Sequence, residues 1–326
     1  MINVTRRCAI GAMATVALML AAPTAVVAQE TLLELRLMAP AGAGGGWDTA
    51  ARSLQQVMTQ TGAVRSVQVT NVPGAGGTVG LSQFVNQADG SSNELLVGGI
   101  TMVGAIISNN SPVTLEQVTP LARLTGDPLV IVVPASSDIQ TIDDLAEAVR
   151  NNTASTIWAG GSAGGADHML AALFTEEAGA DPAQTNYVAF SGGGEALAAM
   201  LGGRVTAGVS GYGEFQGQIE AGELRALALS SPERLEGVDV PTLTEQGVDI
   251  ELVNWRGLFA GPNIADEDKA RLSEVVERTL ASSEWQEILQ VRGWSDYYSP
   301  ADEFATFVSE EETRVREILT SIGLAN

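Results

Sequence analysis

The sequence reads PAGAGGGWDTAAR at residues 40–52, and the rest of the chain can be interpreted from this stretch. An apolar run, residues 32–39, precedes it, and a helical pattern with Ala51, Leu54 and Met58 on one side follows it. This order predicts a strand, a glycine loop and a helix. Consecutive glycines leave the backbone bare, and a helix start presents unpaired N–H groups and the positive end of its dipole. We therefore expect a site for a small anion here.

Three further stretches repeat this arrangement, since each follows a short apolar run and opens a helical pattern. They are residues 71–80 (NVPGAGGTVG), 159–168 (AGGSAGGADH) and 190–195 (FSGGGE). Together with residues 40–52, we number them in chain order as the first to fourth glycine loops. Any one of them alone indicates a tight strand-to-helix turn. Four together favour convergence on one anionic ligand.

The first 28 residues have the pattern of a secretory signal peptide. Arg6 and Arg7 supply a positive start, residues 10–22 an apolar core, and residues 26–28 a small-residue cleavage site. The apolar run is too short for a comfortable membrane span. We therefore predict export by the general secretory route, cleavage after Ala28, and a periplasmic protein.

The chain is strongly acidic, with a net charge of −22. Removing the predicted signal takes away two arginines and no acid, which changes the charge to −24. Such a chain repels nucleic acid and anionic lipid surfaces. Salt screens that field within about 8 Å, so a local anion site remains compatible with it. The single cysteine, Cys8, leaves with the signal, which excludes disulfides and thiol chemistry from the mature chain.

Short apolar runs alternate with helical patterns throughout, which predicts an α/β fold with largely parallel sheets. About 300 residues favour two lobes over one core. We expect a first crossing between the lobes at two strands, residues 121–124 and 129–133, separated by the Gly-Asp-Pro sequence at 126–128. Residues 252–259 are the expected return crossing. The predicted domains are a signal peptide (1–28), a first lobe (29–126), a second lobe (127–252), and a completion of the first lobe by C-terminal helices (253–326).

The last helix is expected to begin at Ser299 and Pro300. A serine at the N-cap and a proline in the first turn are typical of a helix start. The helical pattern then runs to Ile322 and stops at Gly323. Because the chain is expected to cross between the lobes twice, this helix returns to the first lobe. Two connections between the lobes give a hinge, with a cleft between the lobes.

Five motifs occur in an order that resembles the periplasmic solute-binding receptors of tripartite tricarboxylate transporters, also called Bug receptors. They are the first glycine loop, the second glycine loop, GELRALA at 222–228, PTLTEQG at 241–247 and WRGL at 255–258. The resemblance covers essentially the whole mature chain. It implies a two-lobe, Venus-flytrap periplasmic binding protein of type II-like architecture. It also implies a receptor that delivers a carboxylate to a two-component membrane permease. No cofactor is expected, because the sequence contains neither a Walker loop nor a Gly-x-Gly-x-x-Gly motif.

The resemblance further implies where the ligand binds. The loops of the first lobe, residues 44–48 and 74–78, would hold one carboxylate, and residues 162–165 and 190–193 would close on the rest. Two departures concern this pocket. Residues 189–192 read AFSG where the family usually has PYKG, and Trp47 replaces a small residue. The GGGWDT form of the first loop resembles the citrate-receptor branch.

We predict ligand contacts from the glycine loops and from a few polar and aromatic residues, with no catalytic residue and no metal ligand. The predicted site residues are Gly44, Gly45, Gly46, Trp47, Asp48, Gly74, Ala75, Gly76, Gly77, Thr78, Ser162, Gly164, Gly165, Phe190, Ser191, Gly192, Gly193, Ser210, Tyr212 and Trp255. Asp48 is more readily explained as a helix cap than as a ligand contact. Tyr212 fits a ligand contact and a solvated loop residue equally well.

The resulting hypothesis is a receptor for a small di- or tricarboxylate, most simply a citrate-like one. One alternative is a receptor for another small anion: an acidic amino acid, an aromatic carboxylate or a phosphate-type ligand. A second is an exported hydrolase that uses Ser162 and His168, although His168 is better explained as a packing or surface residue. A sensor kinase that detects the closed form is a further candidate partner.

Overall fold

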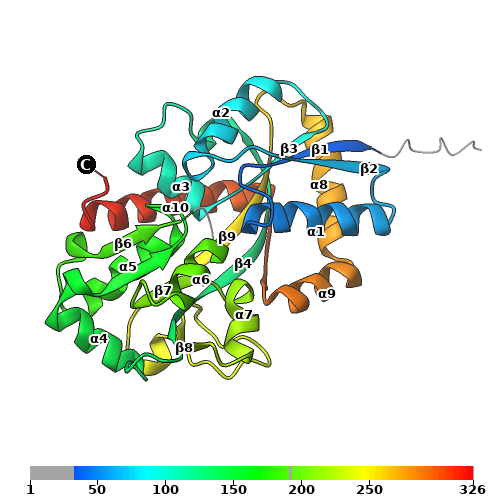
Figure 1. Ribbon diagram of the computed structural model, residues 1–326. Coiled ribbons are helices and arrows are strands. Elements are labelled where there is room, and N and C mark those ends of the chain that lie inside the picture. The colour runs from blue at the N-terminus through cyan, green and yellow to red at the C-terminus, as the bar shows by residue number, and fades with distance from the viewer. Residues whose placement is uncertain (1–32, 191–192, 326) are drawn as a thin grey trace, which may run out of the picture. The chain divides into compact units, whose positions relative to one another are not determined.

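The computed structural model describes residues 33–190 and 193–325, which contain ten strands joined by hydrogen bonds into one mixed sheet (Figure 1). The predicted signal peptide and its cleavage site lie outside the described residues. The strands are β1 (Glu34–Ala39), β2 (Ser66–Asn71), β3 (Glu94–Gly99), β4 (Thr119–Pro134), β5 (Ile157–Gly160), β6 (Asn186–Ala189), β7 (Ala207–Gly211), β8 (Leu224–Leu229), β9 (Val253–Ala260) and β10 (Ser295–Pro300).

Ten α-helices connect and cover these strands within the described ranges. They are α1 (Gly46–Gln60), α2 (Thr78–Gln87), α3 (Ile100–Ser108), α4 (Ile142–Asn151), α5 (Ala166–Glu177), α6 (Gly193–Leu201), α7 (Tyr212–Glu220), α8 (Asp266–Leu280), α9 (Ser283–Arg292) and α10 (Ala301–Ser321). Helix α8 shows why such segments are helical. Its first turn carries Asp266, Glu267 and Asp268 and its last turn Arg278, charges that complement the helix dipole.

The sheet is ordered β2-β1-β3-β9-β4-β7-β5-β6, with β10 and β8 also paired to β4. The pairs β1–β2, β1–β3, β5–β6 and β5–β7 are parallel. Every described pair that includes β4 or β9 is antiparallel. The prediction of largely parallel sheets is therefore wrong. The strand–helix–strand units give parallel pairs, whereas the long strands that connect them run the opposite way.

Strand β4 is continuous over 16 residues, so the prediction of two strands separated at residues 126–128 is also wrong. Its first part pairs with β9 and β10, and its last part pairs with β7 and β8. Gly126, Asp127 and Pro128 are paired with residues of β9. Local turn propensity predicted a break there, but pairing along β9 overrides it.

Strands β4 and β9 stand between β1–β3 and β7 in the sheet, and Figure 1 shows them in the middle of the ribbon. Along β4 the partners change from β9 to β7 between Pro128 and Leu129. The chain enters β9 at Val253 after β8 and the loop that follows it. The domain limits at 126/127 and 252/253 stay a prediction, because the strands form one connected sheet.

Helix α10 packs against α3 and β4 and is drawn in red in Figure 1. Its N-cap residue is Pro300, not Ser299 as predicted. Ser299 belongs to β10, where it pairs with Arg123 of β4, and this pairing holds the residue extended. The core contains large aromatic side chains that are almost fully buried, among them Trp158 and Trp285.

Candidate functional site

All four glycine loops contribute to one pocket with a volume of about 680 Å³. The pocket also receives Thr101 of α3, Asn254 and Arg256 of β9, and Glu214 of α7. A volume of this size is in the range of small-molecule sites. The first two loops follow the paired strands β1 and β2, and the last two follow the paired strands β5 and β6, at the two ends of the sheet.

Of the predicted site residues that the structure describes, more than half line this pocket. They are Gly45, Gly46, Trp47, Gly74, Ala75, Gly76, Gly77, Ser162, Gly165, Gly193 and Ser210. Ser191 and Gly192 lie outside the described residues. The remaining predicted residues, Gly44, Asp48, Thr78, Gly164, Phe190, Tyr212 and Trp255, are described but do not line it.

Asp48 supports the first glycine loop from behind. The residue is only 2 % exposed. It accepts hydrogen bonds from the Gly44 N–H at 2.8 Å, from Asn71 Nδ2 at 2.8 Å and from Arg52 Nε at 2.9 Å. Burial alone would raise the pKa of Asp48, but the hydrogen bonds from Arg52, Gly44 and Asn71 outweigh it and lower the pKa. Asp48 therefore fixes the shape of the loop as a carboxylate.

Gly164 and Thr78 also shape the loops. Gly164 has a positive φ of 72°, and its N–H donates to His168 Nδ1 at 3.1 Å. A Cβ at Gly104 of α3 would come within 2.0 Å of the Gly164 carbonyl oxygen, so α3 lies directly against the third glycine loop. The Thr78 hydroxyl donates to the Ala75 carbonyl at 2.9 Å. These contacts hold the loop backbone in place, and residues next to Gly164 and Thr78 line the pocket instead.

Trp255 was predicted to line the cleft, and it does not. Its side chain is 1 % exposed and packs edge-on against Phe304 and Phe307, with its Nε1–H donating to Glu311 at 2.9 Å. Successive side chains of a strand point to opposite faces. Trp255 therefore faces α10, and the next residue, Arg256, faces the pocket.

Tyr212 and Phe190 pack away from the pocket. Tyr212 is 6 % exposed and belongs to a hydrophobic cluster that includes Phe215 and Met200. Phe190 packs against the same cluster. The solvated-loop interpretation of Tyr212 is therefore wrong as well, because the residue begins α7 with its ring in the core.

Arg256 is the main pocket residue that the sequence analysis missed. It is 2 % exposed and forms a buried ion pair with Asp127 of β4. Within the described residues its Nε and Nη1 atoms have no hydrogen-bond partner. Gly46 is required beside it, because a Cβ there would lie 2.8 Å from Arg256 Nη2. A charged residue inside the apolar run at 252–259 was the signal that could have identified it.

Buried donors without a partner are costly, so the pocket wall contains a guanidinium whose donors are not all satisfied. The starts of two helices add further donors. The N-cap residues Gly45 of α1 and Gly165 of α5 line the pocket, and neither helix start has a side-chain cap. Apart from the Ala166 N–H, which donates weakly to Thr101 Oγ1 at 3.5 Å, their first-turn N–H groups are therefore available to a ligand.

Two acids, Asp167 and Glu214, also line the pocket. Burial raises the pKa of Asp167 to about 7 against the hydrogen bond from Gly161, and the charges of Glu214 and Asp127 add to the rise. Burial and the charge of Asp127 likewise raise the pKa of Glu214. The sequence analysis treated neither residue as part of the site.

Residues 50–324 match the family model described as the tripartite tricarboxylate transporter family receptor, TctC. The chain belongs to this family. Protein BugT of Bordetella pertussis is 26 % identical to it over 298 residues, which cover 89 % of each chain.

Two solved structures resemble this receptor in fold. MatC of Rhodopseudomonas palustris with bound malate has a TM-score of 0.77 at 24 % identity and covers 88 % of this chain and 99 % of its own. R. palustris Rpa4515 with adipate has a TM-score of 0.81 at 21 % identity and covers 90 % of this chain and 98 % of its own. The receptor thus has the two-lobe α/β fold of periplasmic binding proteins, as the sequence predicted.

The alternative hydrolase would use Ser162 and His168 as its catalytic pair. His168 accepts a hydrogen bond through Nδ1 and stacks on Tyr187, with ring centroids 4.2 Å apart. Burial lowers the pKa of His168 to about 4. Ser162 lines the pocket, but the described residues show no hydrogen bond between Ser162 and His168.

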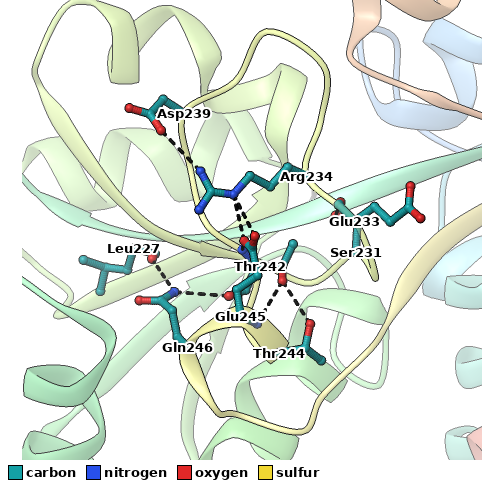
Figure 2. Close-up of polar contacts among 9 residues, drawn as sticks. All are labelled: Leu227, Ser231, Glu233, Arg234, Asp239, Thr242, Thr244, Glu245 and Gln246. Atoms are coloured by element: carbon teal, nitrogen blue, oxygen red, sulfur yellow. Dashed lines mark hydrogen bonds and ion pairs between the residues drawn. The ribbon is translucent and has the colours of Figure 1, made fainter.

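The motif at residues 241–247, part of the family resemblance, does not line the pocket and forms a network of polar contacts (Figure 2). Thr242 and Glu245 cap each other: the Thr242 N–H donates to Glu245 Oε2 at 2.8 Å, and the Glu245 N–H donates to Thr242 Oγ1 at 3.2 Å. Arg234 Nε also donates to Glu245 Oε2 at 2.8 Å. This motif therefore has a structural role in the receptor.

Across the described residues, no helix combines the length and the apolar character that a membrane span requires.

Proposed function

We propose that this receptor captures a small di- or tricarboxylate, of citrate-like size, in the pocket lined by the four glycine loops. We further propose that it delivers this ligand to the permease of a tripartite tricarboxylate transporter. The observation that carries the proposal is Arg256, a buried guanidinium in the pocket wall with two nitrogens that have no partner among the described residues. Export through the signal peptide, with cleavage after Ala28, is part of the same proposal.

The chemistry of the lining supports a carboxylate. A guanidinium and uncapped helix starts are strong donors to an oxygen anion, and carboxylates accept several such bonds at once. Gly45 and Gly46 belong to the first loop and Gly165 to the third, so a ligand with two separated carboxylates could bridge donors from both. Malate and adipate, bound by the two R. palustris proteins of similar fold, are dicarboxylates of this kind.

A bridging ligand would also stabilise the closed arrangement. Thr101 of α3 lies beside the third glycine loop, where its Oγ1 accepts from the Ala166 N–H at 3.5 Å. A ligand that contacts both groups of loops binds this arrangement more strongly than an open one and shifts the population toward it. The closed form would then be the one that the permease recognises.

A thermal-shift screen of refolded mature protein tests the proposal. The panel contains citrate, malate, adipate, acidic amino acids, aromatic acids, phosphate and sulfate. A ligand at about one hundred times its dissociation constant stabilises the fold by roughly 2.7 kcal/mol. We expect the largest shift from a di- or tricarboxylate. A shift from phosphate or sulfate alone would favour the phosphate-type alternative instead.

Arg256→Lys tests the residue that carries the proposal. Lysine keeps the charge opposite Asp127 but loses the guanidinium fork, so the protein should fold and bind the carboxylate about tenfold or more weakly. Arg225→Lys is the matched control, since Arg225 lies outside the pocket lining and donates to three backbone carbonyls. Equal ligand affinity in the two variants would show that Arg256 does not contact the ligand.

A further inference from the structure

The pocket is lined by two carboxylic acid side chains, which would repel the proposed dicarboxylate ligand if both were ionised. Of the described residues that line it, Asp167, Glu214 and Arg256 are the ionisable ones. Arg256 already pairs with Asp127. If all these groups were ionised, a dicarboxylate would meet an excess of negative charge at contact distance, where water and salt screen least. Part of this negative charge must therefore be neutralised when a dianion binds.

Each of the two acids has one oxygen fixed by the protein. Asp167 Oδ2 accepts from the Gly161 N–H at 2.6 Å. Glu214 Oε2 accepts from the Gly193 N–H and from Ser210 Oγ, both at 3.1 Å. The second oxygen of each carboxyl has no hydrogen bond within the described residues, so it is available to a ligand in the pocket.

Several groups on the surrounding elements act on Asp167. Glu214 of α7 and Asp127 of β4 raise its pKa, and Arg256 of β9 opposes them. The balance, dominated by burial, places the pKa at about 7. In the free receptor at neutral pH, this carboxyl is therefore divided between its charged and neutral forms.

Two other titratable neighbours, His168 and Tyr187, carry no charge near neutral pH. His168, next to Asp167 on α5, has a pKa of about 4 because it is buried. Tyr187 of β6 donates to the Gly161 carbonyl at 3.0 Å, and burial together with Asp167 raises its pKa well above the usual value. Glu195 at the start of α6 is exposed. The acids of the pocket therefore have Arg256 as their one cationic neighbour among the described residues that act on them.

We propose that capture of a dicarboxylate is coupled to uptake of one proton by Asp167. The proton comes from solvent and resides on the free oxygen, Oδ1, which then donates a hydrogen bond to the second carboxylate of the ligand. The first carboxylate occupies the side of the pocket that contains Arg256 and the start of α1. Asp167 is thus a specificity-determining residue, and this inference rests on the proposed function.

The direction of the pH dependence follows from this arrangement. A bound dianion beside Asp167 raises its pKa further, so the bound receptor holds a proton that the free receptor loses above pH 7. Affinity therefore falls as the pH rises above 7, by up to about tenfold per pH unit for one proton. Between pH 6 and 7 the affinity changes little for a ligand that stays fully ionised.

Isothermal titration calorimetry with malate and citrate tests the coupling in the unmodified receptor. Titrations at pH 8 in buffers of different ionisation enthalpy report the number of protons exchanged. We expect uptake of about one proton per ligand and weaker binding at pH 8 than at pH 7. Binding without proton exchange, at equal affinity from pH 6.5 to 8.5, would overturn the inference alone. Proton release, with affinity rising with pH, would also overturn it and would indicate a ligand cation at the acids.

Asp167→Asn is the informative variant, because the amide keeps an acceptor for the Gly161 N–H and adds permanent donors. It should bind both probes with an affinity independent of pH from 6.5 to 8.5 and without proton uptake. Asp249→Asn, an exposed acid outside the pocket, is the control and should retain the pH dependence of the unmodified receptor. If neither malate nor citrate binds the unmodified receptor at any pH, the proposed function fails, and the inference fails with it.

Discussion

The first and third glycine loops share a local design but differ in charge. In each, an aspartate in the first turn of a helix accepts a hydrogen bond from a glycine N–H of its own loop: Gly44 to Asp48, and Gly161 to Asp167. Asp48 lies behind its loop, and Asp167 lines the pocket. The pKa of Asp48 is lowered, whereas that of Asp167 is raised to about 7.

The neighbours of the two aspartates explain the difference. Asp48 has Arg52 four residues later on the same helix face, together with Asn71 from the end of β2. At the corresponding position after Asp167 stands Ala171, which is fully buried and has no room for a cation. The comparison teaches that one local motif can serve as a rigid support in one loop and as a proton-binding group in another.

Removal of the Asp48 carboxylate, which supports the first glycine loop, should have the largest effect on stability. Asp48→Ala removes a buried carboxylate that accepts from the Gly44 N–H, the Asn71 amide and Arg52, so we expect the free energy of unfolding to fall by about 3 kcal/mol. Urea denaturation measures it. Asp144→Ala is the control: this exposed carboxylate accepts from the Gln140 and Thr141 N–H groups, and its loss should cost clearly less. Equal losses would show that burial does not distinguish the two aspartates.

The opposite pKa shifts predict opposite pH effects on stability. The contribution of Asp48 is present above its unfolded-chain pKa and is lost as the pH falls below it. The folded state binds a proton at Asp167 that the unfolded chain releases near pH 4, so this residue makes stability fall as the pH rises from about 4 to about 7.

Asp167→Asn should remove that fall. Denaturation of the ligand-free protein at pH 5 and pH 8 measures it, and the loss of stability between these values should be smaller in the variant than in the unmodified receptor. The change should be smaller than that of Asp48→Ala, because a carboxyl that lines a pocket remains partly hydrated. An unchanged difference between pH 5 and pH 8 would show that Asp167 titrates normally.

Removal of the Arg52 guanidinium alone should have the smallest effect on stability. Arg52 is 52 % exposed, and Gly44 and Asn71 still bind Asp48 without it. Arg52→Ala should therefore destabilise the receptor by only about 0.5 kcal/mol. The same denaturation series measures this value. A loss as large as that of Asp48→Ala would mean that the ion pair, and not the backbone hydrogen bond, holds the first loop.

Much of the fold was predictable because local patterns and tertiary contacts agree. Helix α8 is an example, since its acidic start and its apolar face are both local signals in the sequence of residues 266–280. Helix α9 and strand β10 were not predicted. Strand β10 alternates short polar and aromatic residues, and it is a strand because it pairs with β4.

The sequence by itself determined that glycine loops stand at four strand-to-helix junctions and that a family of receptors shares their order. Those features depend on backbone conformation and helix starts, which short segments specify. The tertiary structure alone decided that Arg256 and not Trp255 faces the ligand, and that Asp167 and not Asp48 can bind a proton. These outcomes depend on which side of β9 faces the pocket and on which charges and apolar groups surround each carboxyl. Residues far apart in the chain supply those surroundings, so no local pattern contains them.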